Sequence, residues 1–190
     1  MIDLTSQGLQ ELKTALEDLQ IPFCVVGSYA SSARGEPRAS MDIDLLARVT
    51  HDHAGRLATT LGPEWSVDPE AVVEALRRGR AFNIFYMPGG LKFDLFPVVD
   101  EFHGIQLGRA TVMTLESGIR CPVATAEDMV LAKLQWYRAG GEVSERQWRD
   151  IAGLLKKNRP LDGAYLRHWA SRLRVDDLLS KASAEAGYPL

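Results

Sequence analysis

The spacing of hydrophobic residues predicts an amphipathic helix near the start of the chain, followed by a strand that turns directly into a second helix. Leucines recur at three- and four-residue steps between about residues 5 and 20, with charged residues between them, so one side of this helix is apolar. The short apolar run Phe23–Gly27 favours a buried strand closed by glycine. The small residues from Ser28 to Ala33 favour the start of a helix.

A second strand and a hairpin are expected in the middle of the chain. Residues 42–47 alternate acidic and aliphatic side chains before becoming apolar, which indicates a strand. Two aromatic-rich runs, 82–87 and 91–96, are joined by Pro88-Gly89-Gly90, where a tight turn forms at little cost. The other elements expected here are helices at about 52–61 and 69–78 and short strands near 109–115 and 118–123.

The pattern becomes purely helical after residue 125. Helices are expected at about 126–139 and 145–157, with two more from residue 162 onward. The fold class predicted is therefore α/β (α+β), with a small mixed β-sheet flanked by helices in residues 1–124. A C-terminal helical region occupies residues 125–190.

Composition narrows the class of protein. The 190 residues are 46% hydrophobic and 25% charged, which excludes a disordered or fibrous chain. No apolar stretch approaches the roughly 18 residues that a bilayer-spanning helix needs, and the chain starts without a secretory signal pattern. Cys24 and Cys121 form no metal-binding or disulfide motif, so a cytoplasmic location is expected.

The net charge of −3 hides an uneven distribution. The segment from Lys133 to Arg174 holds ten Lys and Arg against four Asp and Glu, a local charge of +6, which leaves −9 for the rest. Such a segment is either a surface for phosphate or nucleic acid or simply a set of solvated helices.

The clearest chemical signal is the pair Asp42 and Asp44. In a strand, alternate side chains share a face, so both carboxylates project to one side while Ile43 faces the other. Two like charges at this spacing repel each other unless a cation lies between them, and Mg²⁺ prefers oxygen ligands. The same pattern alone also occurs at solvated strand edges.

A third acid, Asp94, strengthens the metal interpretation. It lies in a strand of otherwise mostly apolar residues and shares its face with Lys92 and Phe96. Three carboxylates on neighbouring strands can hold two metal ions roughly 3.5–4 Å apart, as in phosphoryl and nucleotidyl transfer. Gly27-Ser28 adds a turn where backbone N–H groups at a helix start can bind phosphate.

Together these residues resemble the polymerase-beta-like nucleotidyltransferase superfamily. The resemblance rests on Val25-Val26-Gly27-Ser28, on Asp42-Ile43-Asp44-Leu45 thirteen residues later, and on the single acid Asp94 in an apolar strand. The helical continuation resembles AbiEii-type nucleotidyltransferases of abortive-infection and toxin–antitoxin systems, through Glu127-Asp128, Lys133-Leu134 and Arg149-Asp150.

The resemblance implies a nucleotidyltransferase fold and a role for each motif. Asp42 and Asp44 would bind both metal ions, Mg²⁺ or alternatively Mn²⁺, and Asp94 would complete the site and help deprotonate the acceptor hydroxyl. The nucleotide-binding residues implied are Gly27, Ser28, Lys133 and one of the loop arginines, Arg34 or Arg38.

Lys133 also stands out by its position on the helix. Its wheel neighbours are apolar, so a lysine there must extend to solvent, pair with an acid or meet a phosphate. Asp150 lies nearly opposite the apolar face of the next helix, which favours an exposed ion pair with Arg146.

The implied reaction is metal-dependent transfer of a nucleoside monophosphate from a nucleoside triphosphate to an acceptor hydroxyl, with release of pyrophosphate. A tRNA, a protein or a small molecule is a candidate acceptor, and the toxin-like resemblance adds a cognate antitoxin as a candidate partner. The alternative is a catalytically silent protein of the same fold that acts as a binding or regulatory module.

Overall fold

The computed structural model describes residues 3–34, 42–115 and 117–188. The chain divides into two compact units. The first comprises residues 1–29 and 39–124, and the second comprises residues 30–38 and 125–190. Helix α2 (Gly27–Arg34) therefore begins in the first unit and ends in the second.

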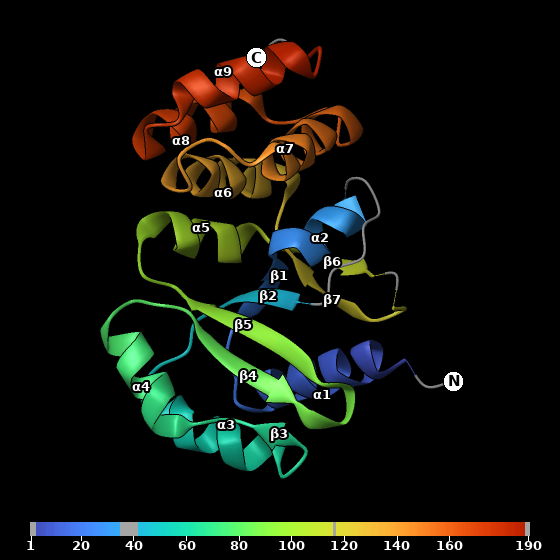
Figure 1. Cartoon of the computed structure of the whole chain (residues 1–190), viewed down its shortest axis with the longest axis vertical. Helices are drawn as coiled ribbons and strands as arrows, with labels where there is room; N and C mark the ends of the chain where they lie inside the picture. Colours follow the sequence, from blue (N-terminus) through green and yellow to red (C-terminus); the bar gives the residue numbers. More distant parts are fainter. Residues whose placement is uncertain (1–2, 35–41, 116, 189–190) are drawn as a thin grey trace. The chain divides into compact units, whose positions relative to one another are not determined.

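A mixed β-sheet forms the centre of the first unit (Figure 1). In the described part of the chain it has seven strands in the order β3-β4-β5-β2-β1-β7-β6. The pairs β2–β5 and β1–β7 are parallel, and the other pairs are antiparallel. The fold class predicted from the sequence is confirmed. The strands are β1 (Phe23–Val26), β2 (Asp42–Ala47), β3 (Trp65–Ser66), β4 (Phe82–Tyr86), β5 (Leu91–Pro97), β6 (Thr111–Thr114) and β7 (Arg120–Val123).

Helix α1 (Leu4–Asp18) covers one face of this sheet and lies behind β4 and β5 in Figure 1. The contact is close, because a Cβ added to Gly8 would lie 2.9 Å from the Tyr86 ring and 3.3 Å from the Phe93 ring. The Trp65 indole donates a hydrogen bond of 3.0 Å to Glu11, which ties β3 to the same helix. The other helices of this unit are α3 (His53–Leu61), α4 (Pro69–Arg77) and α5 (Glu101–Arg109).

Helix α5 and strand β3 lie where the sequence pattern predicts no element. Only Phe102 and Gln106 are buried among the nine residues of α5, and two glycines interrupt it, so its hydrophobic period is weak. Asp100 caps the start of this helix, because its carboxylate accepts a hydrogen bond of 2.8 Å from the His103 N–H.

The second unit is helical and contains α6 (Ala126–Ala139), α7 (Glu145–Lys157), α8 (Gly163–Leu173) and α9 (Asp176–Glu185). Thr125, Ser144 and Asp162 cap the first three of these helices by accepting hydrogen bonds from backbone N–H groups. The end of α2 packs here as well, since the Ser31 hydroxyl contacts the Met129 sulfur at 3.9 Å and the Asn158 amide donates to the Arg34 carbonyl at 2.8 Å.

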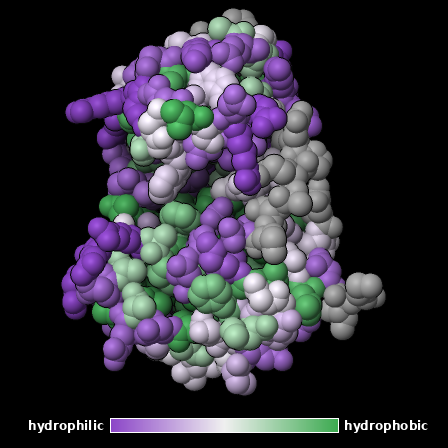
Figure 2. All heavy atoms as spheres, in the orientation of Figure 1, coloured by the Kyte–Doolittle hydropathy of each residue, from purple (hydrophilic) through white to green (hydrophobic). Residues whose placement is uncertain are grey.

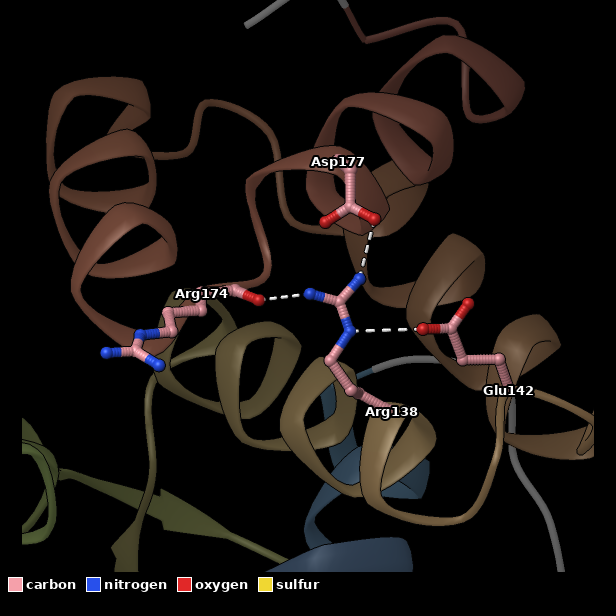
Figure 3. A network of polar contacts seen from close by, with 4 residues as sticks. All are labelled: Arg138, Glu142, Arg174 and Asp177. Atoms are coloured by element: carbon pink, nitrogen blue, oxygen red, sulfur yellow. Dashed lines mark hydrogen bonds and ion pairs between the residues drawn. The ribbon is translucent and has the colours of Figure 1, made fainter.

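Arg138 joins three segments of this unit in a polar network (Figure 3). Its guanidinium donates to Glu142 at 3.0 Å, to Asp177 at 2.6 Å and to the carbonyl oxygen of Arg174. The hydrogen bond from Arg138 lowers the pKa of Asp177, and the same contact raises the pKa of Arg138. The network fixes the end of α6 against the start of α9.

None of the helices in the described ranges combines the length and the apolar character that crossing a membrane requires. In Figure 2, hydrophilic side chains predominate over the C-terminal helices on the face shown, with hydrophobic ones scattered among them.

Candidate active site

The three predicted acids lie on one face of the sheet, opposite the face that α1 covers. Along β2 and β5 the side chains of Ile43, Leu45, Phe93 and Leu95 are buried, so the residues that alternate with them project from the other side. The parallel register places Asp44 beside Asp94 and Asp42 beside Lys92. Strand alternation and register thus bring the carboxylates of two strands together.

Lys92 lies within this acid cluster, defined as Asp42, Asp44 and Asp94. Its ammonium nitrogen is 2.9 Å from Oδ2 of Asp94 and 3.8 Å from Oδ2 of Asp42. The hydrogen bond to Asp94 raises the pKa of Lys92, and the charges of the other two acids act in the same direction. The sequence places Lys92 on this face, but it gives no reason to assign it a partner.

Asn83 is a site residue that the sequence analysis misses. It lies opposite Asp94 in the antiparallel pair of β4 and β5, and its amide donates a hydrogen bond to Oδ1 of Asp94. The only signal for it is the hairpin register, which the turn at residues 87–90 sets. Both carboxylate oxygens of Asp94 therefore accept a hydrogen bond, one from Asn83 and one from Lys92.

Gly27 brings the start of α2 close to the acid cluster. Strand β1 pairs with β2 so that Val26 lies opposite Asp44, and Gly27 follows with a φ of +64°. A Cβ built on Gly27 would lie 1.9 Å from Oδ2 of Asp44, so no residue with a side chain fits at this position. Glycine is thus required here for two reasons. It adopts the positive φ without strain, and it leaves room for the Asp44 carboxylate. Ser28 follows in the first turn of α2.

The donor set of this face fits a hard divalent cation, because it offers three carboxylates on adjacent strands. In the described residues, however, no three His, Cys, Asp or Glu side chains are gathered as closely as a metal site requires. The ammonium of Lys92 lies beside two of these acids, Asp94 and Asp42. A metal ion that used the same oxygen of Asp94 would compete with it.

The remaining predicted nucleotide contacts lie elsewhere in the chain. Arg34 ends α2 within the second unit, and burial lowers its pKa while the charges of Glu127 and Asp128 oppose that shift. Arg38 lies outside the residues that the structure describes.

Lys133 pairs with Asp150 inside the second unit. Their side chains are only 12% and 19% exposed, and the Nζ–Oδ2 distance is 2.9 Å. Asp150 was expected to pair with Arg146 on its own helix, but α6 and α7 pack together and bring Lys133 within reach instead. A contact between Lys133 and a nucleotide stays a prediction from the resemblance.

Replacing Asp150 by asparagine is expected to lower the free energy of unfolding by about 1–3 kcal/mol, because it leaves the mostly buried Lys133 ammonium without its counter-charge. Urea denaturation measures this. Arg146→Gln is the control, since Arg146 is exposed and its replacement is expected to change stability by less than about 0.5 kcal/mol. Equal stabilities of the two variants would show that the ion pair contributes nothing.

The other motifs of the AbiEii resemblance also make internal contacts. Asp128 is fully buried and accepts hydrogen bonds from the Tyr165 hydroxyl and, at 2.7 Å, from the Thr125 hydroxyl. Glu127 accepts a hydrogen bond of 3.1 Å from the N–H of Asp162. These contacts give both acids a structural role at the start of α6.

Several cations of the basic segment are likewise engaged within the second unit. Besides Lys133 and Arg138, Arg159 donates to the carbonyls of Ala186 and Gly187 at 2.9 and 2.8 Å. The Arg172 guanidinium lies 4.7 Å from the centre of the Trp169 ring. The segment from Lys133 to Arg174 thus uses part of its positive charge for internal contacts.

No protein-family model matches the chain, and no curated protein matches it. Solved structures do. A solution structure of the antibiotic-resistance factor ANT(2'')-Ia aligns with a TM-score of 0.54 and 12% identity over 97% of this chain and 99% of that one. A crystal structure of ANT(2'')-Ia in complex with adenylyl-2''-tobramycin aligns with a TM-score of 0.52 and 14% identity, over 90% and 97% of the two chains.

An antigenic nucleotidyltransferase-like protein from Paracoccidioides brasiliensis is similar as well. It aligns with a TM-score of 0.50 and 18% identity over 95% of each chain. At these identities the likeness is one of fold. The chain has the mixed α/β fold of nucleotidyltransferases, as the resemblance in its sequence implies, while none of these neighbours bears on the AbiEii-type assignment.

Proposed function

We propose that this protein is a metal-dependent nucleotidyltransferase that moves a nucleoside monophosphate from a nucleoside triphosphate to an acceptor hydroxyl. The observation that carries the proposal is the register of β2 and β5, which aligns Asp44 with Asp94 on the sheet face opposite α1, next to the start of α2 at Gly27. An acid cluster beside a helix start offers ligands for cations and for phosphate together.

Asp42, Asp44 and Asp94 would hold Mg²⁺ or Mn²⁺, up to two ions. The metal would neutralise charge on the triphosphate and lower the pKa of the acceptor hydroxyl. Asp94 accepts the proton of that hydroxyl, whose oxygen then bonds to the α-phosphorus. The bond from the α-phosphorus to the bridging oxygen breaks, and pyrophosphate leaves.

The first turn of α2 supports the triphosphate. Gly27 lets the backbone approach the site, and the N–H groups and the Ser28 hydroxyl donate hydrogen bonds to phosphate oxygens. Most of the rate enhancement then comes from positioning and charge neutralisation rather than from covalent chemistry by the protein.

A small hydroxylated cation is the acceptor class that we favour. The ANT(2'')-Ia neighbour was solved with an adenylylated aminoglycoside, adenylyl-2''-tobramycin. Outside the basic segment this chain carries a net charge of −9, which attracts cations. Internal contacts of several basic residues weigh against a polyanion such as tRNA. Binding of tRNA would weaken steeply with salt, whereas binding of a small cation, which makes far fewer charge contacts, would weaken much less.

The second candidate function is a catalytically silent module. The observation that favours it is Lys92, whose ammonium pairs with Asp94 and lies near Asp42, two of the three acids that a metal would need. Such a protein would act through a partner, for example an antitoxin, and would bind no triphosphate.

Titration calorimetry distinguishes the two functions. ATP, GTP, CTP and UTP are each tested with and without Mg²⁺ on the parent protein and on Asp42→Asn/Asp44→Asn. The control is Asp18→Asn/Asp52→Asn, which makes the same charge change at two exposed positions on or beside other helices. Magnesium-dependent binding that the site variant loses and the control keeps would support the proposal. If the parent binds no triphosphate at any metal concentration, the silent module is favoured.

A further inference from the structure

The acid cluster contains a cation that is covalently part of the chain. Lys92 projects from β5 between the two strands that carry the acids, with Asp42 beside it on β2 and Asp94 two residues further along β5. Its ammonium touches Asp94 and approaches Asp42, so it contacts acids of both strands at once. A divalent cation bound by the same carboxylates would compete with this ammonium for their oxygens.

We propose that Lys92 is an internal counter-ion that competes with the metal for Asp94 and Asp42 and thereby sets the metal concentration at which the site becomes loaded. The proposal rests on the proposed function, because it assumes that the acid cluster binds a divalent cation. Lys92 is a positioning residue in this scheme, since it acts on the metal ligands and not on the substrate.

Exposure allows Lys92 to leave. Its side chain is 34% exposed, whereas that of Asp94 is 16% exposed, so the ammonium can move into water while the acid stays in place. On its other side, β4 places Phe85 opposite Lys92, which contributes an apolar surface for the aliphatic stem but no alternative charge. The flexible side chain of Lys92 can therefore move its ammonium away from Asp94 while its aliphatic part stays against Phe85.

Asn83 makes the exchange selective. Its amide holds Oδ1 of Asp94 while Lys92 holds Oδ2. A metal ion repels the ammonium strongly and the neutral amide only weakly, so Lys92 departs and Asn83 keeps the carboxylate oriented. A metal ion would then find Asp94 already oriented by Asn83, and the only interaction lost would be the ion pair between Lys92 and Asp94.

Mn²⁺ binding without nucleotide tests the proposal. Electron paramagnetic resonance or calorimetry is applied to the parent, Lys92→Met, Lys92→Arg and the control Lys13→Met. Lys13 pairs with Glu17 on α1 at 2.8 Å, so the control also removes a paired lysine. We expect Lys92→Met to bind Mn²⁺ about tenfold more tightly than the parent, because the competing charge is gone. Lys92→Arg and Lys13→Met are expected to remain near the parent.

A second measurement uses the parent alone and does not depend on how a variant folds. Acetylation of lysines by a water-soluble ester, followed by mass spectrometry, reports the accessibility of each amine. Lys92 is expected to react slowly in metal-free protein and several-fold faster when Mn²⁺ is added, while Lys13 keeps its rate.

The outcomes separate two failures. If the parent binds Mn²⁺ but Lys92→Met binds it no more tightly, and Lys92 acetylation ignores the metal, the competition is disproved and the proposed function stands. If neither protein binds Mn²⁺, the competition falls together with the metal-dependent reaction.

Discussion

Replacing Gly27 by alanine is expected to destabilise the protein by about 2–4 kcal/mol and to remove triphosphate binding. A residue with a side chain at a φ of +64° costs roughly 1–2 kcal/mol by itself. The added methyl would also lie 1.9 Å from Oδ2 of Asp44, so either the β1–α2 junction or the carboxylate must move. Urea denaturation measures the first effect, and calorimetry with the preferred nucleotide measures the second.

Gly90→Ala is the matched control for this variant. Gly90 has a φ of +58°, and a Cβ built there meets nothing within 4 Å, so alanine introduces backbone strain without a clash. We expect it to cost about 1–2 kcal/mol and to leave nucleotide binding unchanged. If Gly27→Ala were no worse than Gly90→Ala in either measurement, the close approach of α2 to Asp44 would have no functional meaning.

Replacing Asp44 by asparagine is expected to reduce nucleotidyl transfer by roughly 10³-fold or more, because the site loses a negatively charged metal ligand. Asp44 is the central acid of the cluster, since its strand lies between β1 and the strand that carries Asp94. The change is nearly isosteric and removes repulsion between neighbouring carboxylates, so stability is expected to stay within about 1 kcal/mol of the parent. Transfer is followed through pyrophosphate release with the nucleotide that calorimetry identifies.

Asp52→Asn serves as the control for this substitution. Asp52 precedes α3 and its side chain makes no capping hydrogen bond, so its replacement is expected to leave transfer unchanged. A folded Asp44→Asn protein that keeps transfer within tenfold of the parent would remove Asp44 from the mechanism.

The residues that sequence reasoning identifies in the first unit are those whose position follows from a local rule. Alternation in a strand is enough to put Asp42 and Asp44 on one face, and an acid in an apolar strand is enough to single out Asp94. Gly27 is visible because a glycine closes an apolar run. None of these inferences requires knowledge of which strands are neighbours.

The contacts that sequence reasoning misses depend on pairing between segments that are far apart in the chain. Asn83 reaches Asp94 only through the hairpin register, and Lys92 reaches Asp42 only because β5 lies beside β2. Lys133 is conspicuous on its own helix, but its partner Asp150 is on the next one. A helical wheel describes one element at a time, so it assigns Asp150 to the nearest cation along the same helix.

The division of α2 between the two units limits how the protein can be recombined. Its first residues lie beside the acid cluster, and its last ones are held by Met129 and Asn158. A chimera that exchanges residues 125–190 for the helices of another enzyme would leave Ser31 and the Arg34 carbonyl facing a surface that did not evolve with them. An exchange of the second unit must therefore replace residues 30–38 together with residues 125–190. Substitutions in these two segments are expected to depend on one another.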